Sequence, residues 1–177
     1  GSSVREDFDL EDLASYIDWS PFFWTWDLKG IFPAILEHPV HGAQAKELFA
    51  DAQKLLTRII REKRFRPRAV FGLYPAQSKN ETVTLLTKEG DPLERFEFLR
   101  QQKRKVSGDI YYSLADFVRP NDTVGAFCVT MGFEVQDFAA EFEKAHDDYS
   151  AILVKALGDR LAEALAEKLH ADVRGLM

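Results

Sequence analysis

The residues best suited to binding chemistry lie in one aromatic segment near the start of the chain, at positions 16–23. Here a single carboxylate, Asp18, stands among side chains with large ring faces. A carboxylate beside aromatic rings suits a cationic ligand group such as an ammonium or a sulfonium, because the charge and the ring quadrupoles both attract it. The segment therefore predicts that Asp18 binds a cationic ligand, with three aromatic neighbours as further contacts: Trp19, Phe22 and Phe23.

The elements around Asp18 allow a second interpretation. Ser20 is a good helix N-cap and Pro21 fits the first helical position, so a short helix is expected over residues 22–26. Asp18 then lies just before a helix N-terminus, where the dipole and the free backbone N–H groups stabilise an acid. A structural capping role and a ligand-binding role for Asp18 both stay open at this point.

No other group of residues makes a self-contained active site. The four histidines lack the spacing that zinc sites use, and neither a glycine-rich phosphate loop nor a Gly-x-Ser-x-Gly nucleophile motif occurs. Cys128 lies in an apolar run that predicts a buried strand, which disfavours a thiolate. His146, Asp147 and Asp148 could bind a divalent cation, or Asp148 could cap the last helix. We expect no catalytic residue and no metal site, zinc included, on this chain.

Composition favours an intracellular globular domain. With 177 residues, 46% of them hydrophobic, the chain can bury one core, so we expect one domain over residues 10–177 after a cloning remnant and linker at 1–9. A net charge of −6 disfavours nucleic acid as a partner, since binding phosphates requires clustered Lys and Arg. No apolar run approaches the roughly 18 residues of a membrane span, and a single cysteine fits a reducing compartment, so a cytoplasmic location without membrane contact is expected.

Hydrophobic patterning predicts an α+β fold in which an antiparallel twisted sheet packs with long helices. Apolar residues that recur every three or four positions indicate helices over 40–63, 135–145 and 149–173. Runs rich in β-forming residues indicate a hairpin of strands at 69–76 and 82–87, a strand near 95–98 and an apolar, central strand at 123–130. The last helix has a predicted buried stripe: Ile152, Leu153, Leu157, Leu161, Leu165 and Leu169.

Six ordered blocks give the chain a resemblance that spans nearly all of residues 10–174. The first block is the aromatic segment itself, Tyr-Ile-Asp-Trp-Ser-Pro-Phe-Phe, and the longest begins with His-Asp-Asp-Tyr-Ser at residue 146. The remaining blocks fall at residues 67–76, 99–102, 113–118 and 125–129. In these blocks and in their order, the chain resembles the activation domain of cobalamin-dependent methionine synthase.

The resemblance implies a function that needs no catalytic residue on this chain. The family domain binds S-adenosylmethionine and docks on the cobalamin-binding domain of the same enzyme, which carries the cobalamin. It thereby supports reductive methylation of cob(II)alamin to methylcobalamin, with an electron from a flavodoxin-type donor. The chain is thus expected to be part of a homocysteine methyltransferase of methionine biosynthesis and not to be catalytic alone.

Residue roles carry over only where the motifs match. Asp18 corresponds to the family aspartate that contacts the methionine part of S-adenosylmethionine. Asp159 corresponds to an acid on the docking face that receives the displaced axial histidine of the cobalamin domain. Its partner acid is expected to be Glu134, although Val135 occupies the strictly aligned place. Glu163 is expected on the same docking face.

A helix-surface role for the acids of the last helix stays open as well. Asp159 and Glu163 have the spacing to form surface ion pairs with Lys155 or Arg160. Such pairs are common on exposed helices and carry no functional meaning by themselves.

The chain departs from the family pattern at its end. The family carries an Arg-Pro-x-x-Gly-Tyr-Pro motif that holds S-adenosylmethionine, and this motif is absent from the printed sequence, so the chain is expected to be a fragment or a shortened member. An alternative function is a docking or capping module for a corrinoid-binding domain that does not itself bind S-adenosylmethionine. An independent methyltransferase is disfavoured by the lack of a glycine-rich nucleotide loop. If the chain lacks the C-terminal part of the family domain, four aromatics that this part would cover are expected to be exposed in part: Phe22, Phe23, Trp24 and Trp26.

Overall fold

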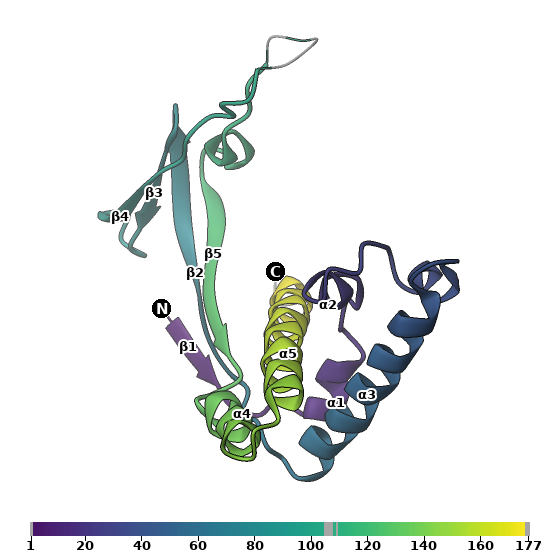
Figure 1. The fold of residues 1–177 in the computed structure, drawn as a ribbon. Coiled ribbons are helices and arrows are strands. Elements are labelled where there is room, and N and C mark those ends of the chain that lie inside the picture. The colour runs from purple at the N-terminus through teal and green to yellow at the C-terminus, as the bar shows by residue number, and fades with distance from the viewer. Residues whose placement is uncertain (1, 105–107, 109, 176–177) are drawn as a thin grey trace. The chain divides into compact units, whose positions relative to one another are not determined.

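The structure, a computed structural model, describes residues 2–104, 108 and 110–175, and Figure 1 shows their fold. The α-helices are α1 (Leu10–Ala14), α2 (Ser20–Trp24), α3 (Gly42–Arg61), α4 (Glu134–Lys144) and α5 (Asp148–Arg174). The strands are β1 (Ser2–Arg5), β2 (Arg68–Lys79), β3 (Thr82–Leu86), β4 (Pro92–Glu97) and β5 (Asp122–Thr130). Short 3₁₀ helices are η1 (Ala34–Glu37) and η2 (Leu114–Phe117).

Contacts among the described residues divide the chain into two compact units. The sheet unit comprises residues 70–127 with residues 2 and 3, and the helical unit comprises residues 4–69 and 128–175. Residues 2–5, which the sequence assigned to a remnant and linker, form strand β1. The expectation of one domain over 10–177 stays a prediction, and its last two residues lie outside the described residues.

The sheet unit is built on the predicted hairpin. Strands β2 and β3 pair antiparallel with Ala76 opposite Leu85, and Asn80 supplies the positive φ of 56° that the tight turn requires. The sheet order is β1-β2-β3-β4, with β5 paired to β2. A small core lies beneath the hairpin: Ala76, Val83, Leu85 and Ala115. The α+β class with an antiparallel sheet is therefore confirmed.

One arginine fastens the segment between β4 and β5 to this hairpin. Arg100 donates to Glu81 at 2.6 Å and to both carboxylate oxygens of Asp116 at 2.7 and 2.8 Å. Asp116 also accepts from the backbone N–H of Ser113, in the capping box that begins η2. The two carboxylates raise the pKa of Arg100, with Asp116 contributing most, so the cation is held as a fixed link within the sheet unit.

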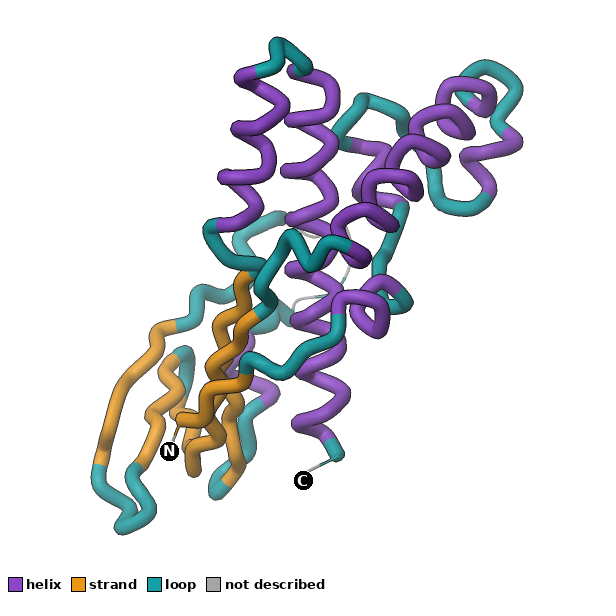
Figure 2. The backbone as a smooth tube through the Cα atoms, turned by 90° about the horizontal axis from the view of Figure 1, so that it is seen from below, coloured by secondary structure: helices purple, strands orange, loops and turns teal. Residues whose placement is uncertain are grey.

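The helical unit is organised around α5, which packs against α1, α2, α3 and α4 (Figures 1 and 2). Of the predicted apolar stripe, Leu153, Leu157, Leu161, Leu165 and Leu169 are buried, with exposed fractions of 3% or less. Ile152 is 46% exposed, so its predicted place in the stripe is wrong. Adjacent residues of a helix point in different directions, so Ile152, which directly precedes buried Leu153, lies off the buried face. None of the helices in the described chain is both long and apolar enough to cross a membrane.

The start of α5 differs from its prediction by one residue. Asp147 is the N-cap, and its carboxylate accepts from the Ser150 backbone N–H at 3.0 Å. This hydrogen bond lowers the pKa of Asp147. Asp148 is the first helical residue instead of the cap, and across the described residues no group of three potential ligands could hold a metal ion.

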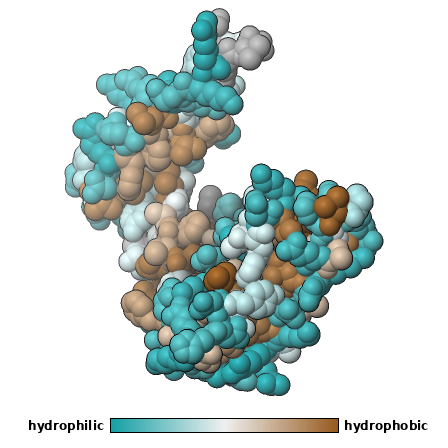
Figure 3. Space-filling model, in the orientation of Figure 1, coloured by the Kyte–Doolittle hydropathy of each residue, from teal (hydrophilic) through white to brown (hydrophobic). Residues whose placement is uncertain are grey.

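The prediction that β5 is a central, buried strand is wrong. β5 pairs with β2, and Phe127 and Cys128 are exposed. An apolar run predicts burial only if other elements cover the strand, and nothing in its own sequence decides that. In the view of Figure 3, apolar residues accordingly show on the surface of the sheet unit between polar ones.

Candidate functional site

Asp18 lies where the sequence placed it, directly before α2. Its Oδ1 accepts a hydrogen bond from the backbone N–H of Ser20 at 2.9 Å, and its side chain is exposed. The predicted cap is wrong in detail, because Trp19 occupies the N-cap position and the Ser20 hydroxyl accepts from the Phe32 N–H at 3.1 Å. Asp18 thus has a structural role at the helix start, and its second oxygen has no protein donor among the described residues.

The aromatic neighbours of Asp18 are mostly inside the protein. Phe22 and Phe23 are fully buried at 0% exposure, so as folded they offer no surface to a ligand, and the predicted ligand contact of both side chains stays a prediction. Trp19 is half-buried and packs edge-on against Phe22 and Phe49, with ring centroids 5.3 and 4.9 Å apart. Of the aromatics expected on the surface, only Trp24 is well exposed, at 55%.

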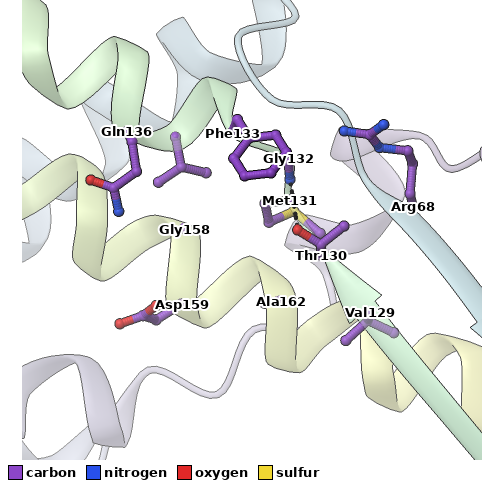
Figure 4. A pocket seen from close by; sticks show the side chains of 11 residues that line it. Arg68, Val129, Thr130, Met131, Gly132, Phe133, Gln136, Gly158, Asp159 and Ala162 are labelled. Atoms are coloured by element: carbon purple, nitrogen blue, oxygen red, sulfur yellow. Dashed lines mark hydrogen bonds between the residues drawn. The ribbon is translucent and has the colours of Figure 1, made fainter.

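A second site lies between α4 and α5, around Asp159 (Figure 4). It is an open pocket of about 580 Å³, entirely within the helical unit. Asp159 is exposed on its rim, and no ion pair or hydrogen bond engages its carboxylate among the described residues. The apolar part of the lining is Val129, Met131, Phe133, Val135 and Ala162.

Two glycines shape this pocket. Gly132, with φ of 89°, turns the chain from β5 into α4, and its N–H donates to Thr130 Oγ1 at 3.0 Å. Gly158 lets α4 and α5 approach closely, because a Cβ there would lie only 2.7 Å from Val135 Cγ1. The pocket therefore depends on two backbone positions that carry no side chain.

The other two acids predicted for docking are engaged elsewhere. Glu134 pairs with Arg66 at 3.4 Å, and its Oε2 is buried without a hydrogen-bond partner. Glu163 accepts from Arg160, at 2.9 Å in one of two hydrogen bonds, which is the surface pairing that the sequence left open. Neither acid is among the pocket-lining residues, whereas Val135 is.

The sequence reasoning missed Arg68 and Gln136, which also line the pocket. Gln136 and Asp159 lie toward one side of the pocket in the view of Figure 4, and Arg68 lies toward the other. Arg68 has a buried Nε without a hydrogen-bond partner. Arg68 begins β2 and Gln136 lies in the first turn of α4, so no local motif links them.

Comparisons with known proteins agree with this fold. A family model described as the activation domain of vitamin B12 dependent methionine synthase matches residues 9–177. The chain is also similar to a protein whose crystal structure is described as the MetH reactivation domain bound to AdoHcy, with 45% sequence identity and a TM-score of 0.88. That match covers 98% of this chain and 55% of the other, so this chain spans about half the length of its structural relative.

Proposed function

The chain belongs to the family of vitamin B12 dependent methionine synthase activation domains, and from this premise we propose that it binds S-adenosylmethionine and docks on the cobalamin-binding domain. One observation carries the proposal: a protein 45% identical over 98% of this chain was crystallised with AdoHcy. AdoHcy is S-adenosylmethionine without the sulfonium methyl group, so a site for one offers most of the contacts that the other needs.

Asp18 is the residue through which this chain would hold the ligand. Its Oδ1 is fixed by the Ser20 N–H, which leaves Oδ2 free to accept from the ligand's ammonium group. A carboxylate already oriented by the backbone loses little freedom when the ligand arrives. Trp19, half-buried beside it, can cover one face of the ligand.

Asp159 is the residue through which the chain would recognise the docked cobalamin domain. An unpaired carboxylate on the rim of a pocket favours the protonated form of an imidazole placed against it. It would therefore stabilise a docked arrangement in which the partner presents a freed histidine. Glu134 and Glu163 are paired with Arg66 and Arg160, so they would contribute less to docking than Asp159 does.

The chemistry of reactivation does not require an acid or a base from this chain. S-adenosylmethionine supplies the methyl group when bound, and an electron comes from a flavodoxin-type protein. The chain's own residues orient the ligand and hold the two domains together, which raises the effective concentration of the reacting groups. The chain therefore needs only groups that bind, and we assign this role to Asp18 for the ligand and to Asp159 for the partner domain.

Calorimetric titration of S-adenosylmethionine into the chain tests the ligand part of the proposal. Asp18→Asn keeps the oxygen that accepts from Ser20 but removes the charge, so the fold should persist. Loss of a charge-assisted hydrogen bond of about 1.5–3 kcal/mol predicts a Kd roughly 10 to 150 times higher. Glu11→Gln, which removes an exposed charge in α1, is the matched control and should bind normally.

The outcomes separate the two candidate functions. Binding that Asp18→Asn weakens and Glu11→Gln does not supports the proposed ligand site. A folded chain that binds the cobalamin domain but not S-adenosylmethionine would instead favour a docking or capping module. Unfolding of Asp18→Asn would assign Asp18 to the helix start alone.

A further inference from the structure

One phenylalanine of the helical unit is unusually exposed to solvent. Phe133 is 84% exposed, whereas every other phenylalanine in the described part of this unit is buried or half-buried. A fully exposed phenylalanine loses the free energy that burial of its ring would contribute. Its position beside the pocket of Asp159 makes it a candidate for contact with another protein (Figure 4).

The backbone of Phe133 is held rigidly. Gly132 precedes it in a positive-φ turn, and Phe133 is the N-cap residue of α4. Its carbonyl accepts from the N–H groups of Gln136 at 2.9 Å and Asp137 at 3.2 Å. An aromatic side chain on a fixed backbone loses little conformational freedom on binding, as anchor residues of interfaces require.

The surroundings of Phe133 combine the features of an interface centre. Apolar Met131 and Val135 line the pocket at its base, and Asp159 and Gln136 bring an unpaired carboxylate and an amide to the rim. Apolar anchors supply most of an interface's affinity, and charged groups beside them select orientation and partner. A partner surface that matches Phe133 and Asp159 would have an apolar recess next to a positively charged side chain, such as a protonated histidine.

We propose that Phe133 is the apolar anchor that inserts into a recess of the cobalamin-binding domain when this chain docks through Asp159. This inference rests on the proposed docking function and adds the residue that supplies most of its affinity. Phe133 acts by binding and positioning, and it touches no reacting group.

The test measures binding of the full 177-residue chain to the separately purified cobalamin-binding domain of the same enzyme. Phe133→Ala is expected to raise the Kd about tenfold or more, which corresponds to about 1.4 kcal/mol. Phe133→Leu keeps an apolar side chain and should restore most of the affinity. Val40→Ala, at another exposed apolar residue with 76% exposure, should change the Kd less than about twofold.

Asp159→Asn separates this inference from the proposed function. The docking model predicts that it weakens binding and reduces the dependence of Kd on salt concentration, because a charge pair is lost. If Asp159→Asn weakens binding while Phe133→Ala binds like the wild type, docking stands and the anchor is refuted. If the folded wild-type chain does not bind the domain, or if neither variant changes the Kd, the proposed docking and the anchor are both refuted. Circular dichroism, which reports total helix content, checks that Phe133→Ala keeps the helicity of the wild type.

Discussion

The close approach of α4 and α5 makes a sharp prediction about Gly158. This residue is buried on α5, and an added Cβ would lie 2.7 Å from Val135 Cγ1 and 3.3 Å from Cγ2. Carbon atoms in contact prefer separations of roughly 3.5–4.0 Å. Val135 is buried and β-branched, so it has few rotamers with which to yield. Gly158→Ala must therefore push the two helices apart or displace Val135.

The expected magnitude follows from two opposing terms. Replacing glycine by alanine inside a helix stabilises it by about 1 kcal/mol, whereas overpacking a core costs about 1–3 kcal/mol. Gly158→Ala should thus lower the free energy of unfolding by about 0–2 kcal/mol, which is too wide a range for one variant to be decisive. Val135→Ala removes both offending methyl groups and leaves only its Cβ, at 3.7 Å from the new atom. In the double variant, the methyl group introduced at position 158 fills part of the vacated space, so its effect should be favourable.

A double-mutant cycle by urea unfolding gives the decisive number. Tryptophan fluorescence reports on the helical unit alone, because all three tryptophans, at positions 19, 24 and 26, lie in it. We expect the double variant to be more stable than the sum of the single effects by about 1–3 kcal/mol. Additivity within about 0.5 kcal/mol would refute the steric account of Gly158.

Two other side chains give further tests. Glu62 accepts from Arg64 and two further arginines, which lowers its pKa to about 2, so its stabilising effect is present above about pH 4.5 and is lost as the pH falls toward 2. The stability difference between wild type and Glu62→Gln in urea unfolding should shrink over that interval, and a constant difference would contradict the ion cluster. His38 Nδ1 accepts from the N–H groups of Val40 and His41 at 3.2 and 3.1 Å. Thermal unfolding should show His38→Ala to be about 0.5–1 kcal/mol less stable and His38→Asn, which keeps an acceptor, close to wild type; equal losses would argue against this hydrogen bonding.

Elements with a strong local pattern were predictable. The long helices were expected at 40–63, 135–145 and 149–173 and are found at Gly42–Arg61, Glu134–Lys144 and Asp148–Arg174. The hairpin of β2 and β3 follows from β-forming residues on either side of a turn. In each case the signal is the spacing of apolar residues, which a helix or a strand expresses wherever it packs.

The short elements α1, η1 and η2 escaped the sequence analysis, whereas the short helix α2 (Ser20–Trp24) was expected at residues 22–26. Helix α1 spans five residues, and η1 and η2 span four each, too few for a period to be visible. Side-chain caps set where α1 and η2 begin, at Asp9 and Ser113, and similar side chains occur at many positions in loops.

The two candidate sites show the same division. Asp18 was predictable, because its role before α2 depends only on residues two positions away. Other features depend on how distant segments pack. They are the burial of Phe22 and Phe23, the ion pair of Glu134 with Arg66, and the position of Gln136 beside Asp159. None of these contacts lies within reach of a local motif.

By itself, the sequence determined where the long helices lie, which family the chain resembles and that Asp18 stands directly before a helix. Periodicity, motifs and capping chemistry can be read from neighbouring residues. Only the tertiary structure decided which aromatics are buried and which acid is unpaired. It also decided that Phe133 stands exposed beside a pocket. Burial and pairing are properties of surfaces brought together from distant parts of the chain, and they exist only once elements such as α2, α4 and α5 have packed together.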